Sequence, residues 1–89
     1  MDDFDVALGR LLARLREEGG LSQEALAASL GRDQPLVSKV ERGQRRVSVA
    51  DLLAWLDALG VSLGEIVGDI ERLPGGAGSD SLWRGGGRA

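Results

Sequence analysis

The chain has 89 residues, a formal net charge of −3 at pH 7, and neither cysteine nor histidine. This length allows one small domain, and the missing residue types exclude disulfides, the usual zinc sites, thiol nucleophiles and imidazole bases. No apolar run approaches the roughly 20 residues of a membrane span, and the N-terminus is acidic where a secretory signal would be basic. We therefore expect a soluble cytoplasmic protein with no catalytic residue, metal or cofactor.

Apolar residues recur at helical spacing from Phe4 to Leu15, which predicts a first helix that ends at the following pair of glycines. A second, shorter helix is expected to open at Ser22 as its N-cap and to close at Gly31. A third is expected from Asp33, another good N-cap, to Gly43. The proline at its second helical position marks a helix start, because the N–H that proline lacks has no partner there.

The fourth and fifth helices are predicted from capping boxes, Ser48 with Asp51 and Ser62 with Glu65. The fourth ends at Gly60, and the fifth runs to about residue 73. No strand pattern is visible, so the expected fold is all-α, with five short helices in one domain over residues 1–73. Residues 74–89 contain six glycines and predict a flexible tail, in which the pair "LW" at 82–83 (Leu82 and Trp83) is either accidental or a docking element for a protein partner.

Positive charge is concentrated between residues 32 and 46, although the chain as a whole is acidic. This window holds five of the eleven basic residues and two acidic ones, a net charge of +3 between segments of −3 and −4. A local field of this kind can attract a polyanion, because distant charges are screened beyond about 10 Å. The alternative is an ordinary solvated loop.

The second and third helices, joined by a glycine turn, form the helix-turn-helix arrangement in which the second helix lies in a DNA major groove. If Val37 and Val40 face the core, a rotation of about 100° per residue turns Pro35, Lys39 and Arg42 outward. Gln34 and Ser38 then lie on the flanks of this face. A glutamine here suits base-edge recognition, because its amide pairs bidentately with adenine. Trp55, among the leucines of the fourth helix, is expected in the core.

The segment "LSQEALAASLGRDQPLVSKVERGQRRVSVADLLAWLDALGVSLGEIV", residues 21–67, resembles the phage-repressor and Cro-like helix-turn-helix family, also called the xenobiotic-response-element family. With the preceding "LLARLREEGG", the resemblance covers about residues 4–73. It implies a compact lambda-repressor-like domain of five helices that binds double-stranded DNA.

The resemblance also implies roles for individual residues. Positions matching those that face the bases are Gln34, Pro35, Leu36, Ser38 and Lys39. Residues expected at the phosphates are Gln23, Arg32, Arg42, Arg45 and Arg46. Arg16 and Glu41 match an ion pair that ties the first helix to the recognition helix.

Three positions depart from the family pattern. Arg32 stands where an aliphatic residue is usual, so either its stem packs or its head reaches a phosphate. Pro35 and Leu36 replace polar residues, which suggests apolar contact with thymine methyl groups.

The expected function is a sequence-specific DNA-binding transcriptional regulator, with repression favoured. A homodimer is expected because one small module buries little surface on DNA, and the fifth helix, with Gly64 and Gly68 on one stripe, is the predicted dimer element. The alternative is a protein-interaction module, such as an antitoxin-like or adaptor helix-turn-helix protein. An enzyme would need an acid–base pair, and the carboxylates near the helix ends are explained by capping and solvation.

Overall fold

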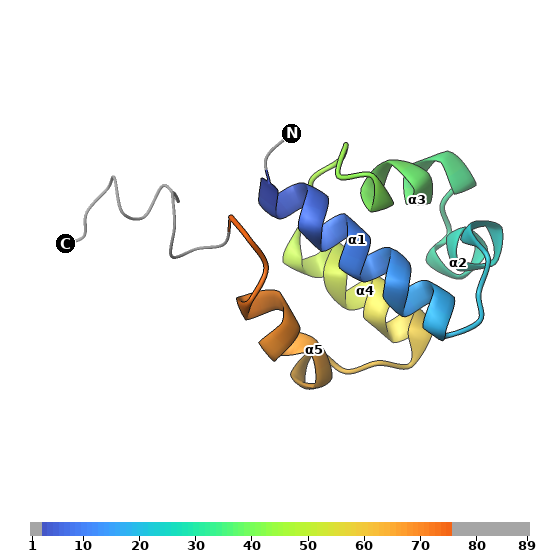
Figure 1. The fold of residues 1–89 in the computed structure, drawn as a ribbon. Coiled ribbons are helices and arrows are strands. Elements are labelled where there is room, and N and C mark those ends of the chain that lie inside the picture. Colours follow the sequence, from blue (N-terminus) through green and yellow to red (C-terminus); the bar gives the residue numbers. More distant parts are fainter. Residues whose placement is uncertain (1–2, 76–89) are drawn as a thin grey trace.

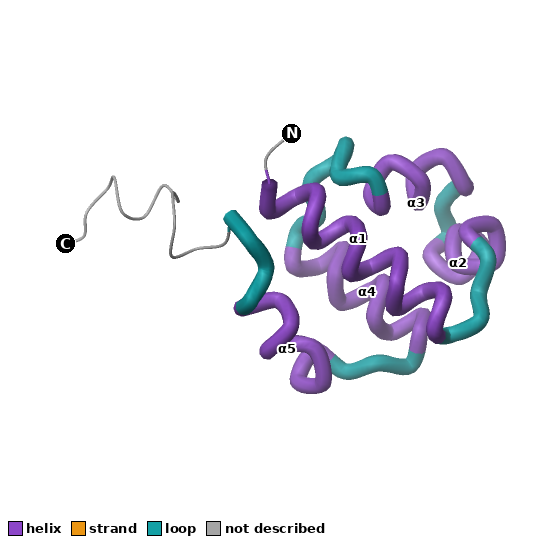
Figure 2. The backbone as a smooth tube through the Cα atoms, in the orientation of Figure 1, coloured by secondary structure: helices purple, strands orange, loops and turns teal. Residues whose placement is uncertain are grey.

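The computed structural model describes residues 3–75, and within that range it consists of helices, turns and loops without any strand (Figure 2). The helices are α1 (Asp3–Glu18), α2 (Gln23–Leu30), α3 (Gln34–Glu41), α4 (Val49–Leu59) and α5 (Leu63–Glu71). The predicted all-α, five-helix fold is confirmed. The fifth helix ends two residues before the predicted position, a difference typical of frayed helix ends.

The helices α1 and α4 run through the middle of the molecule, with α2 and α3 on one side and α5 on the other (Figure 1). Both α1 and α2 contact both α3 and α4. The α2–α3 pair is therefore seated on two longer helices, which leaves the opposite side of α3 facing outward.

One hydrophobic cluster holds these helices together. Its members are Leu8, Leu11, Leu12, Leu26, Ala27, Val37, Val40 and Trp55. Leu26 and Val37 are completely buried, so α2 and α3 each insert a side chain into the same core. Trp55 is 3% exposed and lies in this core, as predicted.

Side-chain hydrogen bonds cap the N-termini of α2 and α3 at the residues that the sequence predicted. The Ser22 hydroxyl accepts a hydrogen bond from the Ala25 N–H at 3.0 Å, and the Asp33 carboxylate accepts one from the Leu36 N–H at 3.2 Å. Between these two N-caps, Gly31 takes the left-handed conformation, with φ of 67°. The turn that sets α3 against α2 is therefore specified by Gly31 and Asp33, while Ser22 fixes the start of α2.

Gly9 has a structural role that the sequence did not reveal. A Cβ at this position would lie 2.5 Å from the Val40 carbonyl oxygen and 2.7 Å from that of Glu41. The backbone of α1 thus approaches the backbone at the end of α3 too closely for any side chain. A glycine inside a helix is usually a destabilising residue, and only the crossing of the two helices explains this one.

The described helices lie within the domain predicted over residues 1–73. Apart from Pro74 and Gly75, the tail predicted over 74–89, with Leu82 and Trp83, lies outside the described residues. Within residues 3–75, no helix combines the length and the apolar character needed to cross a membrane.

Candidate nucleic-acid interface

The outward side of α3 is a polar and basic ridge. Val37 and Val40 are 0% and 4% exposed and hold the inner side of the helix against the core. Pro35, Lys39 and Arg42 are exposed, as the helical rotation predicted, and the two flanking residues at positions 34 and 38 are partly exposed. The described chain therefore leaves this side of α3 open to a partner.

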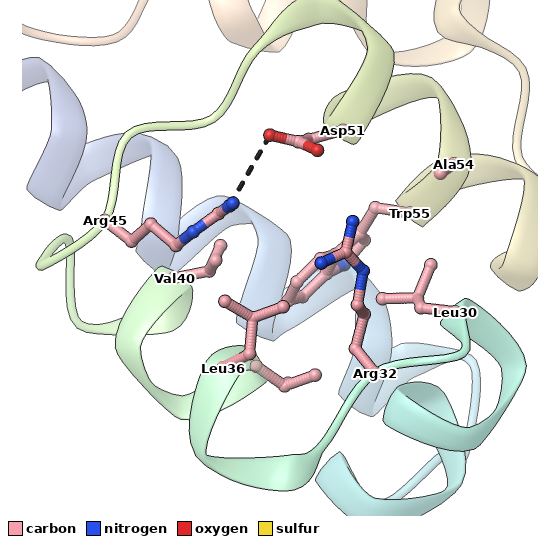
Figure 3. Close-up of a pocket in the computed structure, with 9 residues that line it drawn as sticks. Leu30, Arg32, Leu36, Val40, Arg45, Asp51, Ala54 and Trp55 are labelled. Atoms are coloured by element: carbon pink, nitrogen blue, oxygen red, sulfur yellow. Dashed lines mark hydrogen bonds and ion pairs between the residues drawn. The ribbon is translucent and has the colours of Figure 1, made fainter.

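Leu36 lies apart from the other four residues predicted to face the bases. Its side chain is partly buried and lines a cavity of about 100 Å³ between α3 and α4, together with Val40 and Trp55 (Figure 3). Like Gln34 and Ser38, Leu36 is only partly buried, and its contact with thymine methyl groups stays a prediction.

Arg32 lines the same cavity, and its extended side chain runs beside Leu36 and Trp55 in Figure 3. The residue as a whole stays exposed, so both alternatives for Arg32, a packed stem and a head that reaches a phosphate, stay predictions. The nearby Trp55 Nε1 is buried without a hydrogen-bond partner among the described residues.

Arg16 of α1 and Glu41 at the end of α3 form a largely buried ion pair. Arg16 Nε lies 2.6 Å from Glu41 Oε2, and a second guanidinium nitrogen lies 3.0 Å from Oε1. The side chains are 11% and 7% exposed. The hydrogen bond to Glu41 raises the pKa of the Arg16 guanidinium above its usual value, so Arg16 stays charged. This contact ties the recognition helix to α1.

A hydrogen-bonded chain continues from this pair to the outward side of α3. Gln23 Nε2 donates to Glu41 Oε1 at 2.8 Å, and Gln34 Nε2 donates to Gln23 Oε1 at 2.7 Å. Three helices thus contribute to one network that ends at Gln34. The resemblance pointed to the Arg16–Glu41 pair and assigned Gln23 and Gln34 to the DNA-facing surface, but it did not reveal the contact between Gln23 and Glu41 that joins them.

The basic residues after α3 pair with polar groups of their own chain. Arg45 lies 3.5 Å from Asp51 Oδ2, and Arg46, whose side chain is 85% exposed, lies 3.6 Å from Asp5 Oδ2. Arg42 donates to the Ser38 hydroxyl and to the Gln44 side-chain oxygen. The Arg45 and Arg46 side chains are 39% and 85% exposed, and ion pairs at the surface are worth about 0–1 kcal/mol, so these arginines can exchange their partners for phosphates at little cost.

Asp51 is the N3 residue of α4, and its carboxylate accepts a hydrogen bond from the Ser48 N–H at 3.1 Å. This bond, the Ser48 hydroxyl and, to a smaller extent, Arg45 lower the pKa of Asp51 below the usual 3.8. Asp51 is therefore ionised at neutral pH, where it both caps α4 and positions Arg45. Within residues 3–75, no group of three acidic side chains could hold a metal ion.

Comparison with known proteins, like the geometry, indicates a helix-turn-helix domain. A family model described as a helix-turn-helix domain matches residues 7–66. The control protein C.MunI of a Mycoplasma species is 38% identical over 73 residues, which are 81% of this chain and 99% of that protein.

Two further relatives are of the same kind. The HTH-type transcriptional regulator y4dJ of Sinorhizobium fredii is 40% identical over 74 residues, 83% of this chain and 96% of the relative. The crystal structure of the restriction-modification controller protein C.AhdI from Aeromonas hydrophila matches with a TM-score of 0.63 and 44% identity, covering 68% of this chain and 92% of that one. This chain therefore belongs to the helix-turn-helix family, in its phage-repressor and Cro-like branch of DNA-binding transcriptional regulators.

Proposed function

We propose that this regulator binds a specific DNA operator as a two-fold dimer, with α3 of each subunit in the major groove. The observation that supports this most directly is the position of α3. Its apolar side is locked into the core by Val37 and Val40, while its opposite side presents Gln34, Ser38 and Lys39 to the exterior. A major groove about 12 Å wide admits a helix presented in this way.

In this proposal, Gln34 and Lys39 contact base edges, and Pro35 and Ser38 fill the surface between them. Arg42, Arg45 and Arg46 hold phosphates beside the groove. Residues at the base edges supply specificity, and residues at the phosphates supply position and salt-dependent affinity.

Groups at the start of α2 are further phosphate contacts in this proposal. The first backbone N–H groups of a helix have no intrahelical partner and favour anions. Gln23 is the first residue of α2, and its side chain already braces Gln34. Arg32 is expected to reach a phosphate only with its head, because its stem lies along the cavity beside Trp55.

Apolar side chains on α4 and α5 support the dimer. Val49 and Leu53 on α4 are 69% and 46% exposed, and Leu63 and Val67 on α5 are 37% and 45% exposed. Each pair is spaced by four residues and so occupies one face of its helix. Covering both pairs with a second copy removes this apolar surface from water.

The predicted glycine stripe of α5 supports the dimer less well. A Cβ at Gly68 would lie 3.4 Å from the guanidinium of Arg72, so this side chain covers the position. Gly64 is exposed. We therefore assign the contact to the exposed leucine and valine side chains of α4 and α5, rather than to a close approach of glycines.

The match covers 99% of C.MunI and 92% of C.AhdI, so these regulatory proteins are little longer than the matched domain. We propose repression as the mode of action, because occupying an operator that overlaps a promoter is sufficient for it. We propose no catalytic role, and a cytoplasmic location where the DNA is accessible.

Selection of bound duplexes from a random pool tests this function. We expect a consensus with two half-sites related by a two-fold axis and separated by about one helical turn, 10–10.5 base pairs. A protein-interaction module would select no consensus. A single unrepeated half-site would support DNA reading but contradict the dimer.

Replacing Gln34 with alanine is expected to remove the preference for one base pair in each half-site. A good bidentate contact gives about 1–3 kcal/mol of discrimination, so the affinity of the dimer for the selected operator should fall by about that amount for each half-site. Competition binding against operators substituted at each position in turn measures this. If the loss were the same on every sequence, Gln34 would not read a base.

Replacing Arg45 with alanine is expected to weaken binding to all DNA sequences alike. The dimer loses one phosphate contact in each half-site, so the slope of log affinity against log salt should become shallower by about one per half-site, or about two in all. Affinities measured over a series of salt concentrations give this slope, with Gln34→Ala as the control whose slope should stay unchanged. An unchanged slope in Arg45→Ala would remove Arg45 from the phosphate contacts.

A further inference from the structure

We propose that Glu41 sets the direction of the Gln34 amide, and thereby the base that this regulator prefers, although it lies away from the outward side of α3. Glu41 would act as a positioning residue, through Gln23. This inference rests on the proposed function, because it concerns how Gln34 reads DNA. It depends on the donor-to-acceptor direction of the hydrogen bonds that link Glu41, Gln23 and Gln34. The chemical groups of these three side chains determine that direction.

The chain starts from a group that can only accept. The Glu41 carboxylate accepts hydrogen bonds from the Arg16 guanidinium on both of its oxygens. Its side chain is 7% exposed, so water has little access to it. Any further neighbour at Glu41 must therefore be a donor.

Gln23 is the next member, and its amide has only one favourable direction. Its Nε2 donates to Glu41 Oε1 at 2.8 Å, which leaves Oε1 pointing away from the carboxylate. The reverse direction would place an amide oxygen against a carboxylate oxygen in a poorly solvated position. Such a contact loses a charge-assisted hydrogen bond and adds repulsion between two acceptors.

The orientation of the Gln34 side-chain amide is fixed as well. Gln23 Oε1 accepts from Gln34 Nε2 at 2.7 Å, so one amide hydrogen of Gln34 is engaged. The groups left for DNA are the Oε1 acceptor and the second amide hydrogen. Side-chain amides are often ambiguous in direction, but here the fixed acceptor at Glu41 resolves both of them.

An acceptor beside a donor is the complement of adenine, which offers the N6 amino group as donor and N7 as acceptor. Guanine offers O6 and N7, which are both acceptors, so its O6 would face the Gln34 oxygen. The polarised chain thus favours adenine over guanine at the base that Gln34 contacts. A freely turning amide would discriminate less, because its amino group could be directed at guanine.

Two variants interrupt the hydrogen-bonded chain of side chains at different points. The double variant Arg16→Met with Glu41→Met removes the fixed acceptor and its partner together, so that no charge is left buried alone. The variant Gln23→Met leaves the ion pair in place and removes the middle member. Arg16→Lys is the matched control, because it weakens the ion pair but keeps the acceptor at Glu41.

The measurement is the ratio of affinities for adenine and guanine at the base pair that Gln34→Ala identifies, using operator duplexes that differ only there. We expect the unaltered protein to prefer adenine by about 5- to 150-fold. In Gln23→Met and in the double variant, the affinities for the adenine and guanine operators should differ by no more than about threefold. The preference is lost because binding to the guanine operator improves relative to binding to the adenine operator. The ratio should be unchanged in Arg16→Lys.

The outcomes separate this proposal from the function on which it rests. If the unaltered protein selected no operator, the proposed function itself would fail. If it preferred adenine and Gln34→Ala lost that preference, but Gln23→Met and the double variant both kept it, only the role of Glu41 would be refuted. A loss in Arg16→Lys as large as in those two variants would show that helix positioning, and not polarity, sets the preference. Thermal unfolding followed by circular dichroism establishes which variants are folded. If the double variant is not, Glu41→Gln decides the test, because it keeps the shape of the side chain but replaces the fixed acceptor with an amide that can present either its oxygen or its amino group to Gln23.

Discussion

Replacing Glu41 with alanine is expected to lower the free energy of unfolding by about 3–5 kcal/mol. The change removes one partner of a pair whose side chains are 11% and 7% exposed, and leaves the Arg16 guanidinium without its carboxylate. It also leaves the Gln23 amide without its acceptor. Small domains have only about 5–15 kcal/mol of stability, so a substantial fraction of the molecules should be unfolded at moderate temperature.

Urea denaturation followed by circular dichroism measures this loss. The double variant Arg16→Met with Glu41→Met should recover most of it, because a buried ion pair replaced by packed apolar side chains is often no less stable. Asp69→Ala is the matched control for an exposed pair, since Arg72 and Asp69 are 74% and 42% exposed, and it should cost less than about 1 kcal/mol. A loss in Glu41→Ala as small as this control would mean that the pair is not effectively buried.

Replacing Gly43 with alanine is expected to destabilise the protein by about 2–5 kcal/mol. The residue follows α3 with φ of +74°, and a Cβ there would lie 2.7 Å from the Val6 Cα of α1. The left-handed conformation costs a residue with a side chain roughly 1–2 kcal/mol. Forcing apart two packed backbones adds about 1–3 kcal/mol.

Gly60→Ala separates these two contributions. Its φ is +72°, but nothing lies within 4 Å of the position that a Cβ would occupy. Only the conformational cost of roughly 1–2 kcal/mol should appear there. Equal losses in the two variants, measured by urea denaturation under the same conditions, would show that α1 does not press on Gly43. Gly43→Ala should in addition weaken operator binding, because it displaces α1 from the end of α3.

The helix boundaries were predictable because the groups that determine them are close in sequence. The Ser22 hydroxyl bonds to an N–H three residues later, as does the Asp33 carboxylate. The capping box of Ser48 and Asp51 has the same spacing, with both of its hydrogen bonds formed. Interactions of this range depend on residue type and spacing alone, so the residues themselves indicate them.

The candidate site was predicted less completely. The family resemblance pointed to Gln34, Gln23 and the Arg16–Glu41 pair, and the structure places all four in one network. It did not separate Leu36 from its neighbours on α3. Whether a residue beside a buried position faces DNA or α4 depends on how far the neighbouring helix covers it, and helical periodicity does not contain that information.

By itself, the sequence determined the composition limits, five helices with N-caps for four of them, the helix-turn-helix pair and the residues that match its family. Tertiary structure alone decided the close approach at Gly9, the positions of Leu36 and Arg32 beside Trp55, and the contact between Gln23 and Glu41. The physical reason is separation along the chain: Gln23 and Glu41 are 18 residues apart. Contacts between such positions exist only once the core has set the crossing of α1, α2 and α3, whereas caps and periodicity act within a few residues.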